Sequence, residues 1–379
     1  MIEITSPDKC CGCSACASIC PQNAIKMSPD NLGFLYPVIN KDECINCGAC
    51  DRVCQFNDFY DISTNYEKPE TYAARHINID EVDKSRSGAI FAAISDYIIS
   101  QDGVVYGAGF TDHFRVVHKR AVTAVERDEF RGSKYVQSDL TGIFPSVKKD
   151  LEEGKLVLFS GTPCQISGLK GYIGKSLRKN LLLIDLVCHG VPSPYIWRDY
   201  IDYIEKKTHD EIVSVNFRDK RKYGWKAHKE SFTFKHKSLW EKGTYTNLFH
   251  KQIMFRHSCG NCPFANLRRP GDITLADFWG WETVVPDFNK DDKGISLLLI
   301  NTEKGTKIFN LIKEKIITQK VEIEQCLQPN LQHPSRINLK RDLFEKDYSK
   351  KGFKYIKKKY VDGGIRHKIQ TLVHKIIRK

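Results

Sequence analysis

Residues 10–20 read Cys-Cys-Gly-Cys-Ser-Ala-Cys-Ala-Ser-Ile-Cys, and residues 44–54 read Cys-Ile-Asn-Cys-Gly-Ala-Cys-Asp-Arg-Val-Cys. Both stretches contain the spacing Cys-x2-Cys-x2-Cys-x3-Cys, with which proteins hold pairs of [4Fe-4S] clusters. In such pairs the fourth cysteine of each stretch binds the other cluster. We therefore predict two interlocked clusters, one on Cys10, Cys13, Cys16 and Cys54 and the other on Cys20, Cys44, Cys47 and Cys50.

Other uses of closely spaced cysteines explain this pattern less well. Disulfide scaffolds belong to oxidising compartments, but no secretory signal precedes Cys10, so we expect a cytoplasmic protein with reduced thiols. Zinc sites use two CxxC pairs and do not need the further cysteines of each stretch. Pro21 follows the first stretch as the pattern expects, whereas Gln55 replaces the second proline, a difference that affects a turn and no ligand. Cys11 is adjacent to a ligand and is not predicted to be one.

The chain has 379 residues, of which 41% are hydrophobic and 28% charged, enough for two or three units with cores of their own. No apolar run reaches the roughly 18 residues of a membrane-spanning helix. The net charge of +13 is uneven, because residues 1–60 hold seven Asp or Glu and four Lys or Arg, whereas residues 340–379 hold four and fourteen. Since the excess lies in the tail and no nucleic-acid-binding motif accompanies it, we predict no nucleic-acid partner.

The hydrophobic pattern divides the chain into four parts. Residues 1–58 are predicted to form an α+β, ferredoxin-like domain for the two clusters, and residues 59–70 to form a linker. Residues 71–330 are predicted to form a larger mixed α/β domain, and residues 331–379 a basic, helical tail. Apolar residues recur at helical spacing between positions 365 and 377. Such an amphipathic helix usually packs on its own domain, although peripheral contact with an anionic membrane or docking to a partner is an alternative.

Strands alternate with helices of ten to fifteen residues in the larger domain, a pattern typical of parallel pairing in an α/β fold. The predicted strands cover residues 71–75, 104–110, 114–122, 156–159, 181–187, 273–278 and 295–300. The predicted helices cover residues 90–98, 140–153, 163–172, 194–207 and 302–317. Residues 212–234 show strand-like alternation.

Four cysteines of the larger domain lie in unusual settings. Cys164 follows a predicted strand, and Pro163 opens the next helix, so the thiol faces the positive end of the helix dipole, which lowers its pKa. Cys188 also lies where a predicted strand meets a helix, and Cys259 and Cys262 form a CxxC loop. The four could hold a third cluster. Spacing alone leaves two other interpretations open, namely buried inert thiols for the first two cysteines and half of a zinc knuckle for the loop.

Several motifs accompany these cysteines. They are Ser-Gly-Thr-Pro-Cys-Gln-Ile-Ser-Gly-Leu-Lys at 160–170, Cys-His-Gly-Val-Pro-Ser-Pro at 188–194, and the CxxC loop followed by Gly-Asp-Ile-Thr-Leu-Ala-Asp-Phe-Trp-Gly at 271–280. Ser-Arg-Ser-Gly at 85–88 and Arg-Gly-Ser-Lys-Tyr-Val-Gln-Ser at 131–138 are two more. Over residues 71–330 these motifs resemble the coenzyme F420 hydrogenase/dehydrogenase beta-subunit family. Ala89 and Ala276 stand where that family usually has glycine.

The resemblance implies an iron–sulfur flavoprotein that binds FAD. It also favours a third [4Fe-4S] cluster on Cys164, Cys188, Cys259 and Cys262. A flavin accepts single electrons and exchanges a hydride, so it links cluster chemistry with the chemistry of an organic substrate. No GxGxxG fingerprint is present, which argues against an NAD(P)H-binding Rossmann domain.

Candidate cofactor-binding residues follow from the same motifs. Helix N-termini with small or hydroxyl residues bind pyrophosphate groups, so we select Ser87, Gly88, Ser133, Lys134, Gly161 and Thr162. Ordinary helix caps and turns would use the same residue types. His189 is a candidate proton donor, although a structural hydrogen bond is the commoner role of such a histidine.

We therefore expect an oxidoreductase that passes electrons between its clusters and an FAD, which exchanges hydride with a small molecule or a deazaflavin coenzyme. A ferredoxin-type or other redox protein is the expected partner. Two alternatives remain open. One is an electron-transfer subunit that has no substrate of its own, and the other is an enzyme that uses Cys164 as a nucleophile together with His189.

Overall fold

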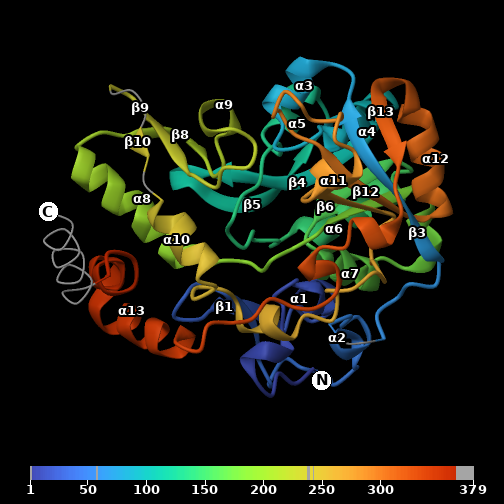
Figure 1. The fold of residues 1–379 in the computed structure, drawn as a ribbon. Coiled ribbons are helices and arrows are strands. Elements are labelled where there is room, and N and C mark those ends of the chain that lie inside the picture. Colours follow the sequence, from blue (N-terminus) through green and yellow to red (C-terminus); the bar gives the residue numbers. More distant parts are fainter. Residues whose placement is uncertain (1, 57–58, 237–239, 242, 364–379) are drawn as a thin grey trace, which may run out of the picture.

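The computed structural model describes residues 2–56, 59–236, 240–241 and 243–363. In the view of Figure 1 the cysteine-rich N-terminal residues lie beneath a large twisted sheet. A smaller sheet lies to one side, near α8 (Pro194–Thr208) and α13 (Arg341–Ile356). None of the helices within these residues combines the length and apolar character that a membrane crossing requires.

The N-terminal unit is built around an antiparallel hairpin of β1 (Ile25–Pro29) and β2 (Leu35–Ile39). Two short helices, α1 (Ala15–Ile19) and α2 (Ala49–Arg52), each lie within one cysteine stretch. The buried core of this unit consists of Ile2, Cys16, Ile25 and Cys50. Because so small a core contributes little, metal ligation is expected to supply much of the stability of this unit.

A mixed sheet of eight strands forms the centre of the larger unit. Its strands are β3 (Asn65–His76), β4 (Val104–Thr111), β5 (Arg115–Ala121), β6 (Val157–Gly161), β7 (Leu181–Leu186), β11 (Ile273–Asp277), β12 (Ser296–Thr302) and β13 (Ile316–Lys320). Their order is β13-β3-β12-β11-β7-β6-β4-β5. The middle strands β11, β7, β6 and β4 pair in parallel, and antiparallel pairs flank them. The predicted mixed α/β fold is thereby confirmed.

Helices cover both faces of this sheet. On one face lie α4 (Ile90–Ser100) and α12 (Glu303–Ile312), and on the other lie α6 (Ile143–Glu152) and α7 (Pro163–Tyr172). Successive strand residues point to opposite faces, so strands such as β4 and β6 contribute to both cores. Three shorter helices are α3 (Ile79–Lys84), α5 (Ala124–Asp128) and α11 (Trp281–Val284).

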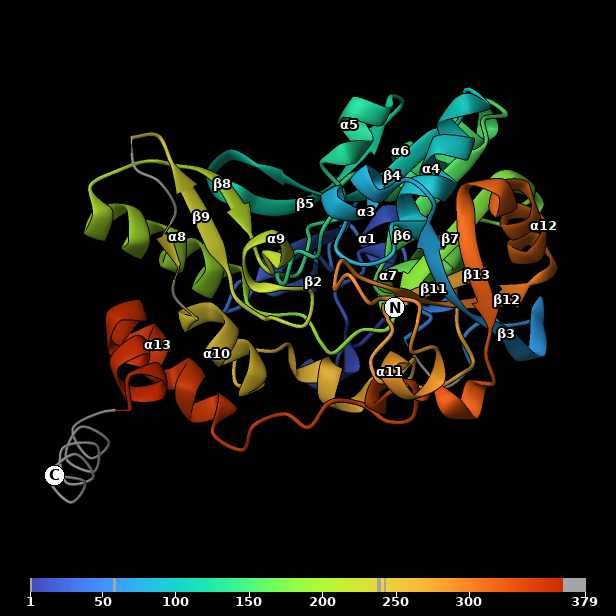
Figure 2. The ribbon, with the colours of Figure 1, turned by 45° about the horizontal axis from the view of Figure 1, so that its top comes forward.

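A smaller antiparallel sheet has the order β10-β9-β8. Its strands are β8 (Ile212–Asn216), β9 (Ser231–Phe234) and β10 (Trp240–Glu241), and α9 (Lys220–Tyr223) and α10 (Thr244–His250) lie next to them in sequence. The sheet shares one core with α8, α10 and α13, as Figure 2 shows from above. Leu32 and Phe34 of the N-terminal unit belong to the same core. The N-terminal unit is therefore packed against the rest of the chain.

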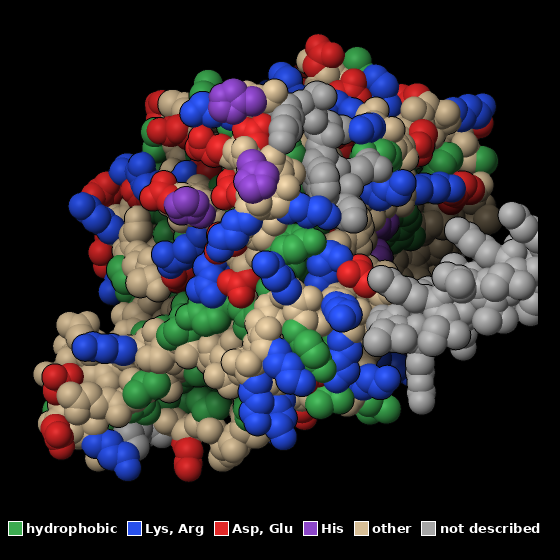
Figure 3. All heavy atoms as spheres, turned by 90° about the vertical axis from the view of Figure 1, so that its left-hand side faces the viewer, with side chains coloured by type: hydrophobic (Ala, Val, Ile, Leu, Met, Phe, Trp, Pro, Cys, Tyr) green, Lys and Arg blue, Asp and Glu red, His purple; other side chains and the backbone are tan. Residues whose placement is uncertain are grey.

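The tail region is helical as far as it is described. Besides α13, residues Lys357–Val361 form one further turn. Lysines of α13 contribute to the Lys and Arg side chains on the face in Figure 3, where Asp and Glu side chains lie among them. The predicted amphipathic helix at 365–377 lies outside the described residues.

Two predicted boundaries differ from the structure. β3 begins at Asn65, inside the stretch 59–70 that we predicted to be a linker, and Glu70 pairs with Ile300. This end of β3 is largely exposed, so backbone pairing rather than apolar burial holds it. The helix predicted at 302–317 ends at Ile312, because the β-branched pair Ile316 and Ile317 begins the edge strand β13.

Candidate iron–sulfur and cofactor-binding site

The two cysteine stretches fold into matching loops. Gly12 and Ser14 have left-handed backbone conformations in the first loop, and Asn46 and Gly48 have them at the equivalent positions of the second. Turns of this kind direct backbone N–H groups into the loop, and the Gly12 N–H donates to Cys10 Sγ at 3.4 Å. The repeated spacing therefore produces a repeated sulfur-binding geometry.

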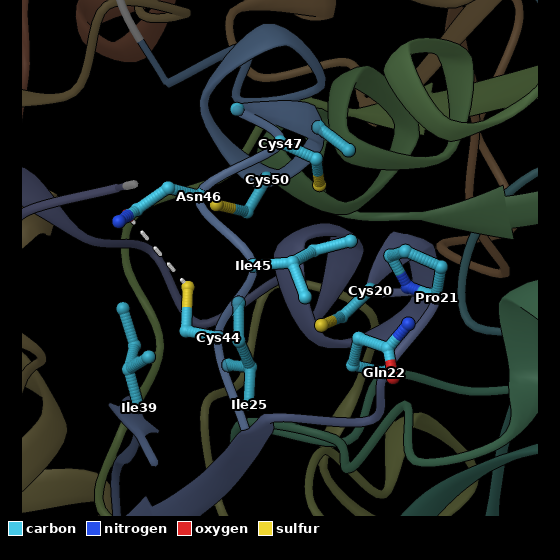
Figure 4. Close-up of a pocket in the computed structure, with 12 residues that line it drawn as sticks. Cys20, Pro21, Gln22, Ile25, Ile39, Cys44, Ile45, Asn46, Cys47 and Cys50 are labelled. Carbon is cyan, nitrogen blue, oxygen red and sulfur yellow. Dashed lines mark hydrogen bonds between the residues drawn. The ribbon is translucent and has the colours of Figure 1, made fainter. Parts of the chain in front are cut away.

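The outer site consists of Cys20, Cys44, Cys47 and Cys50, which line one small cavity (Figure 4). Ile25, Ile39 and Ile45 also line this cavity. Cys47 is exposed and Ile45 is 61% exposed, so the outer site lies at the protein surface. Cys20 of the first stretch thus lies with three cysteines of the second, an arrangement that fits interlocked ligation.

The inner site consists of Cys10, Cys13, Cys16 and Cys54. Burial raises the pKa of Cys16, and the charges of the other three thiols raise it further. Burial also raises the pKa of Cys54, and the charges of Cys13 and Cys10 act in the same direction. Such mutual effects require the four thiols to be close together, as they must be to share a cluster.

The third site brings together Cys164, Cys188, Cys259 and Cys262. Cys164 lies in the first turn of α7, directly after β6, and Cys188 follows β7. Because β6 and β7 are parallel neighbours, their carboxyl ends carry both cysteines to the same edge of the sheet. The CxxC loop begins in a short 3-10 helix, His257–Asn261, and the Val191 N–H donates to Cys259 Sγ at 3.3 Å.

The thiols of the third site influence one another. Burial raises the pKa of Cys188 to about 11 and that of Cys262 to about 12, and the charge of Cys164 raises both further. Burial raises the pKa of Cys259 well above its usual value, and the charges of the other three cysteines add to the rise. The fold therefore places four thiols from three distant segments in one buried group.

A buried ion pair joins two of these segments. Asp185 at the end of β7 accepts hydrogen bonds from Arg269 Nε at 3.2 Å and Nη2 at 2.9 Å. Its other oxygen accepts from the Gly271 N–H at 2.9 Å. Asp185 and Arg269 are almost fully buried. The pair thereby fixes the segment after the CxxC loop to the strand that leads to Cys188.

A chain of hydrogen bonds supports the turn at Cys164. The Thr162 N–H donates to Gln165 Oε1 at 3.0 Å, and Gln165 Nε2 donates to Ser138 Oγ at 2.8 Å. Ser138 Oγ lies 2.9 Å from His118 Nδ1, and His118 Nε2 lies 3.0 Å from the Ser160 carbonyl oxygen. The chain is complete when the Ser138 hydroxyl donates to Nδ1 and Nε2–H donates to Ser160, which is the neutral form of His118. Burial lowers the pKa of His118 to about 4, in keeping with that form.

Two glycines bring the third site next to the inner site. Gly168 and Gly171 follow Cys164 along α7 at helical spacing, so the three lie on one face of the helix. A Cβ at Gly168 would lie 2.7 Å from Cys13 Sγ, and one at Gly171 would collide with the Val53 carbonyl oxygen. Close contact between the N-terminal unit and α7 therefore depends on glycine at both positions.

Cys11 lies between these two sites and is only 6% exposed. Its thiol shares hydrogen bonds with Cys13 and Cys164, which raise the pKa of Cys11 well above its usual value. The same hydrogen bonds lower the pKa of Cys13 and lower that of Cys164 to about 7. Cys11 thus links the inner and third sites without belonging to either group of four.

These groups fit [4Fe-4S] clusters better than single metal ions. Within the described ranges, no three His, Cys, Asp or Glu side chains converge closely enough to hold one metal ion. A cluster makes a different demand, because each cysteine binds a separate iron and the sulfurs surround the cluster. Backbone N–H groups that donate to cysteine sulfur, as Ile2 does to Cys50 at 3.2 Å, are typical of the same environment.

A central cavity of about 320 Å³ adjoins the third site through Cys188. Five of the six predicted FAD-binding residues line it: Ser87, Ser133, Lys134, Gly161 and Thr162. The sixth, Gly88, is not among the lining residues, because its N–H donates to Ser296 Oγ at 2.9 Å. Ala89 does line the cavity, with a φ of 63° that favours the glycine usual in the resembling family.

His189 also lines the central cavity, and burial lowers its pKa. In the part of the chain that the structure describes, no hydrogen bond engages its imidazole ring. The structural hydrogen bond that we considered the commoner role is therefore not seen there. A neutral His189 ring is instead available to a molecule in the cavity.

Sequence reasoning missed other residues that line the cavity, including His118, Arg218 and His228. Arg218 pairs with Asp277 at 2.5 Å, and burial lowers the pKa of His228 to about 3. These residues lie on β5 and in the segment between β8 and β9, far from the cysteine motifs in sequence. Local spacing carries no signal for them.

A basic cavity of about 310 Å³ shares Arg86, Arg131, Ser133, Lys134 and Arg218 with the central cavity. Its basic lining residues are Lys84, Arg86, Arg131, Lys134, Arg218, Lys220 and Arg221, and its acidic ones are Asp83, Asp128 and Asp219. Excess positive charge suits phosphate groups. Ser133 and Lys134 thus lie where an apolar space meets a basic one.

Comparison with known proteins bears on both halves of the chain. Residues 154–325 match the family model for the C terminus of the coenzyme F420 hydrogenase/dehydrogenase beta subunit, and residues 9–57 match that for a 4Fe-4S dicluster domain. No curated protein matches the chain. Among solved structures, the chain is similar to one in the xenon-derivatised F420-reducing [NiFe] hydrogenase complex from Methanosarcina barkeri. The TM-score is 0.47 and the identity 16%, over 78% of this chain and 93% of that chain.

The family matches agree with the motifs from which we recognised the resemblance. They include Cys164, Cys188 and the CxxC loop in one family and both cysteine stretches in the other. Such a combination is that of an iron–sulfur electron-transfer protein among oxidoreductases. Through residues 154–325 the chain belongs to the coenzyme F420 hydrogenase/dehydrogenase beta-subunit family, and through residues 9–57 it carries a 4Fe-4S dicluster domain.

Proposed function

We propose that the chain is an iron–sulfur flavoprotein in which electrons pass between the outer, inner and third sites and an FAD held in the central cavity. The observation that carries the proposal is the double position of Cys188. It belongs to the group of thiols in the third site, and it also lines the central cavity beside His189. A redox group in the cavity would therefore adjoin a cluster.

The lining of the cavities supports a flavin in particular. A volume of about 320 Å³ is within the range of cofactor pockets. Apolar side chains such as Phe91, Tyr135 and Trp279 suit a planar ring, and Ser133 and Lys134 border the basic cavity that suits a pyrophosphate. When bound, the flavin would supply the exchange between single electrons and hydride.

Two residues have proposed roles toward such a cofactor. Lys134 Nζ donates to the backbone oxygens of Glu129 at 2.8 Å and Arg131 at 3.3 Å, and burial lowers its pKa to about 8. A phosphate group beside Lys134 would favour its protonated form. His189 would hold or donate a proton next to the substrate, which we propose to be a small organic molecule or a deazaflavin.

Quantitation of cofactors after anaerobic purification tests the proposal. We expect about twelve irons, as many sulfides and one FAD per chain, and a visible spectrum that dithionite bleaches. Lys134→Met should reduce flavin content and leave iron content unchanged. About eight irons without flavin would contradict the proposal and retain only the dicluster domain.

Turnover by the isolated chain separates this proposal from an electron-transfer subunit without a substrate. A flavin-loaded chain that reduces only a partner protein would favour the subunit. The nucleophile hypothesis has less support, because the hydrogen-bonding neighbours of Cys164 are Cys11 and Thr162. Activity that survives removal of iron would favour it.

A further inference from the structure

Arg256 is fully buried, as are three other arginines of the chain. Each of those three pairs with a carboxylate, in the pairs Arg127–Asp96, Arg269–Asp185 and Arg341–Glu345. Among the residues that the structure describes, no carboxylate pairs with Arg256. A buried cation without a counter-ion is costly, so its place in the fold requires a compensating negative charge.

Neutral groups hold the Arg256 guanidinium in place. Nε donates to the Cys10 carbonyl oxygen at 2.8 Å, Nη2 to that of Leu35 at 2.9 Å, and Nη1 to Gln137 Oε1 at 3.1 Å. The Tyr36 ring lies 4.1 Å from the guanidinium carbon. These contacts join the segment before the CxxC loop to both strands of residues around the inner site, but they supply no full negative charge.

The nearest candidates for that charge are cysteines. A Cβ on Gly12, between Cys10 and Cys13, would lie 2.8 Å from Arg256 Nη1. Burial raises the pKa of Cys10, and Arg256 opposes that rise through its charge. The Cys11 hydrogen bonds lower the pKa of Cys13 and Cys164, and the Arg256 charge adds to both effects. Arg256 therefore faces the inner site and the adjoining part of the third site.

We propose that Arg256 is the built-in counter-ion of the inner cluster and makes the inner site a better electron acceptor than the outer site. A thiolate-ligated cluster is anionic and becomes more so on reduction, so a fixed positive charge beside it raises its reduction potential. Arg256 contacts residues of the inner site, whereas the outer site lies at the protein surface around Cys47. This inference rests on the cluster assignment proposed above and does not require the flavin.

The consequence is a direction for electron flow. A protein that donates one electron at a time would reduce the exposed outer site, and the electron would then favour the inner site, next to Cys164. The transfer makes and breaks no bond and takes up no proton, because one site is oxidised as the other is reduced. Arg256 acts through the cluster potential and is an electrostatic positioning residue.

An anaerobic redox titration of the full chain, followed by electron paramagnetic resonance, tests this inference. Cys47→Ser identifies the signal of the outer site. In the wild type we expect the inner site to have the more positive potential. Arg256→Gln should shift the inner potential to a more negative value and leave the outer one unchanged, and Arg256→Lys should retain most of the wild-type value.

Arg341→Gln is the matched control, because Arg341 is equally buried and donates to the neighbouring Phe255 carbonyl oxygen but is neutralised by Glu345. It should leave both potentials unchanged. An unchanged inner potential in Arg256→Gln, or an equal shift at both sites, would overturn the inference. If Arg256→Gln binds no iron, the order of the two wild-type potentials decides, and a more positive outer site overturns it. A wild type without iron would instead refute the cluster assignment.

Discussion

The dicluster unit and the third site hold cysteines in opposite ways. The inner and outer sites take all eight from two loops of the same spacing, and Cys47 among them is exposed. The third site takes four from three segments that only the folded sheet brings together. Local spacing therefore organises the first region before the fold exists, whereas the second is a product of the fold.

This difference has an energetic counterpart. The small core of the dicluster unit offers little stability without metal, so its loops and its clusters should form together. The third site rests on strands β6 and β7, which are buried on both faces, and on the Asp185–Arg269 pair. Changes in the scaffold should therefore damage the third site first and leave the dicluster unit able to bind iron.

Asp185→Ala is expected to have the largest effect. It leaves Arg269 as an unpaired buried charge, which should lower the free energy of unfolding by about 3–5 kcal/mol. Chemical denaturation measures this loss, and iron analysis should show about four irons fewer per chain, with the dicluster signals retained. Glu303→Gln is the control, because Glu303 and Lys307 form an exposed pair at 2.7 Å. Equal iron loss from both regions would break the comparison.

Acid should also act on the third site through His118. Its pKa is about 4 in the folded chain and about 6.5 in the unfolded chain, so the folded protein binds fewer protons between these values. The free energy of unfolding should therefore fall as the pH is lowered from 6.5 to 4, by about 3 kcal/mol. Because His118 supports Ser160 and the turn at Cys164, the loss should be local to the third site.

His118→Gln tests the source of that pH dependence. The amide can still donate to Ser160 but does not titrate, so the unfolding free energy should vary less between pH 6.5 and 4. His113→Gln, at an exposed position in the turn of the same hairpin, should keep the wild-type slope. Denaturant titrations at several pH values give the comparison, and identical slopes for wild type and His118→Gln would refute it.

Gly168→Ala addresses the contact between the two regions. The added Cβ would lie 2.7 Å from Cys13 Sγ and 2.8 Å from Cys13 Cβ. We expect a loss of about 1–3 kcal/mol from overpacking and slower electron transfer from the inner to the third site. Stopped-flow reduction and denaturation measure the two effects.

Gly174→Ala is the matched substitution for Gly168→Ala. A Cβ there meets no atom within 4 Å, and its φ of −58° suits alanine. Its stability should therefore rise by about 0.4–1 kcal/mol. Unchanged stability and unchanged transfer in Gly168→Ala would mean that the two regions are not held together at α7.

The sequence revealed most of the elements that build the sites. The helix predicted at 163–172 has those bounds, and the strands before Cys164 and Cys188 lie within one or two residues of their predicted ends. Their apolar runs are buried on both faces, so hydrophobicity reports them directly. The start of β3 at Asn65 escaped prediction because backbone pairing with β12 holds it and few of its first side chains are buried.

The site residues divide in the same way. Cysteine spacing was sufficient for the two stretches, and motif order for the third group. Arg256 and His118 were missed, since a buried cation or imidazole looks like any surface residue until its neighbours from distant segments are known. Gly88 shows the opposite error, because a glycine that permits tight packing carries the same local signature as one beside a cofactor.

Cys11→Ala should have the smallest effect, and it sharpens the boundary between the two regions. Cys11 is adjacent to ligands of both the inner and the third site and shares hydrogen bonds with Cys13 and Cys164. If the groups of four are correct, removal of its thiol should leave the iron content unchanged and cost about 1 kcal/mol or less. Cys13→Ala, one loop position away, should remove the inner cluster. Loss of about four irons in Cys11→Ala would make Cys11 a ligand and would require a new division of the cysteines between the two regions.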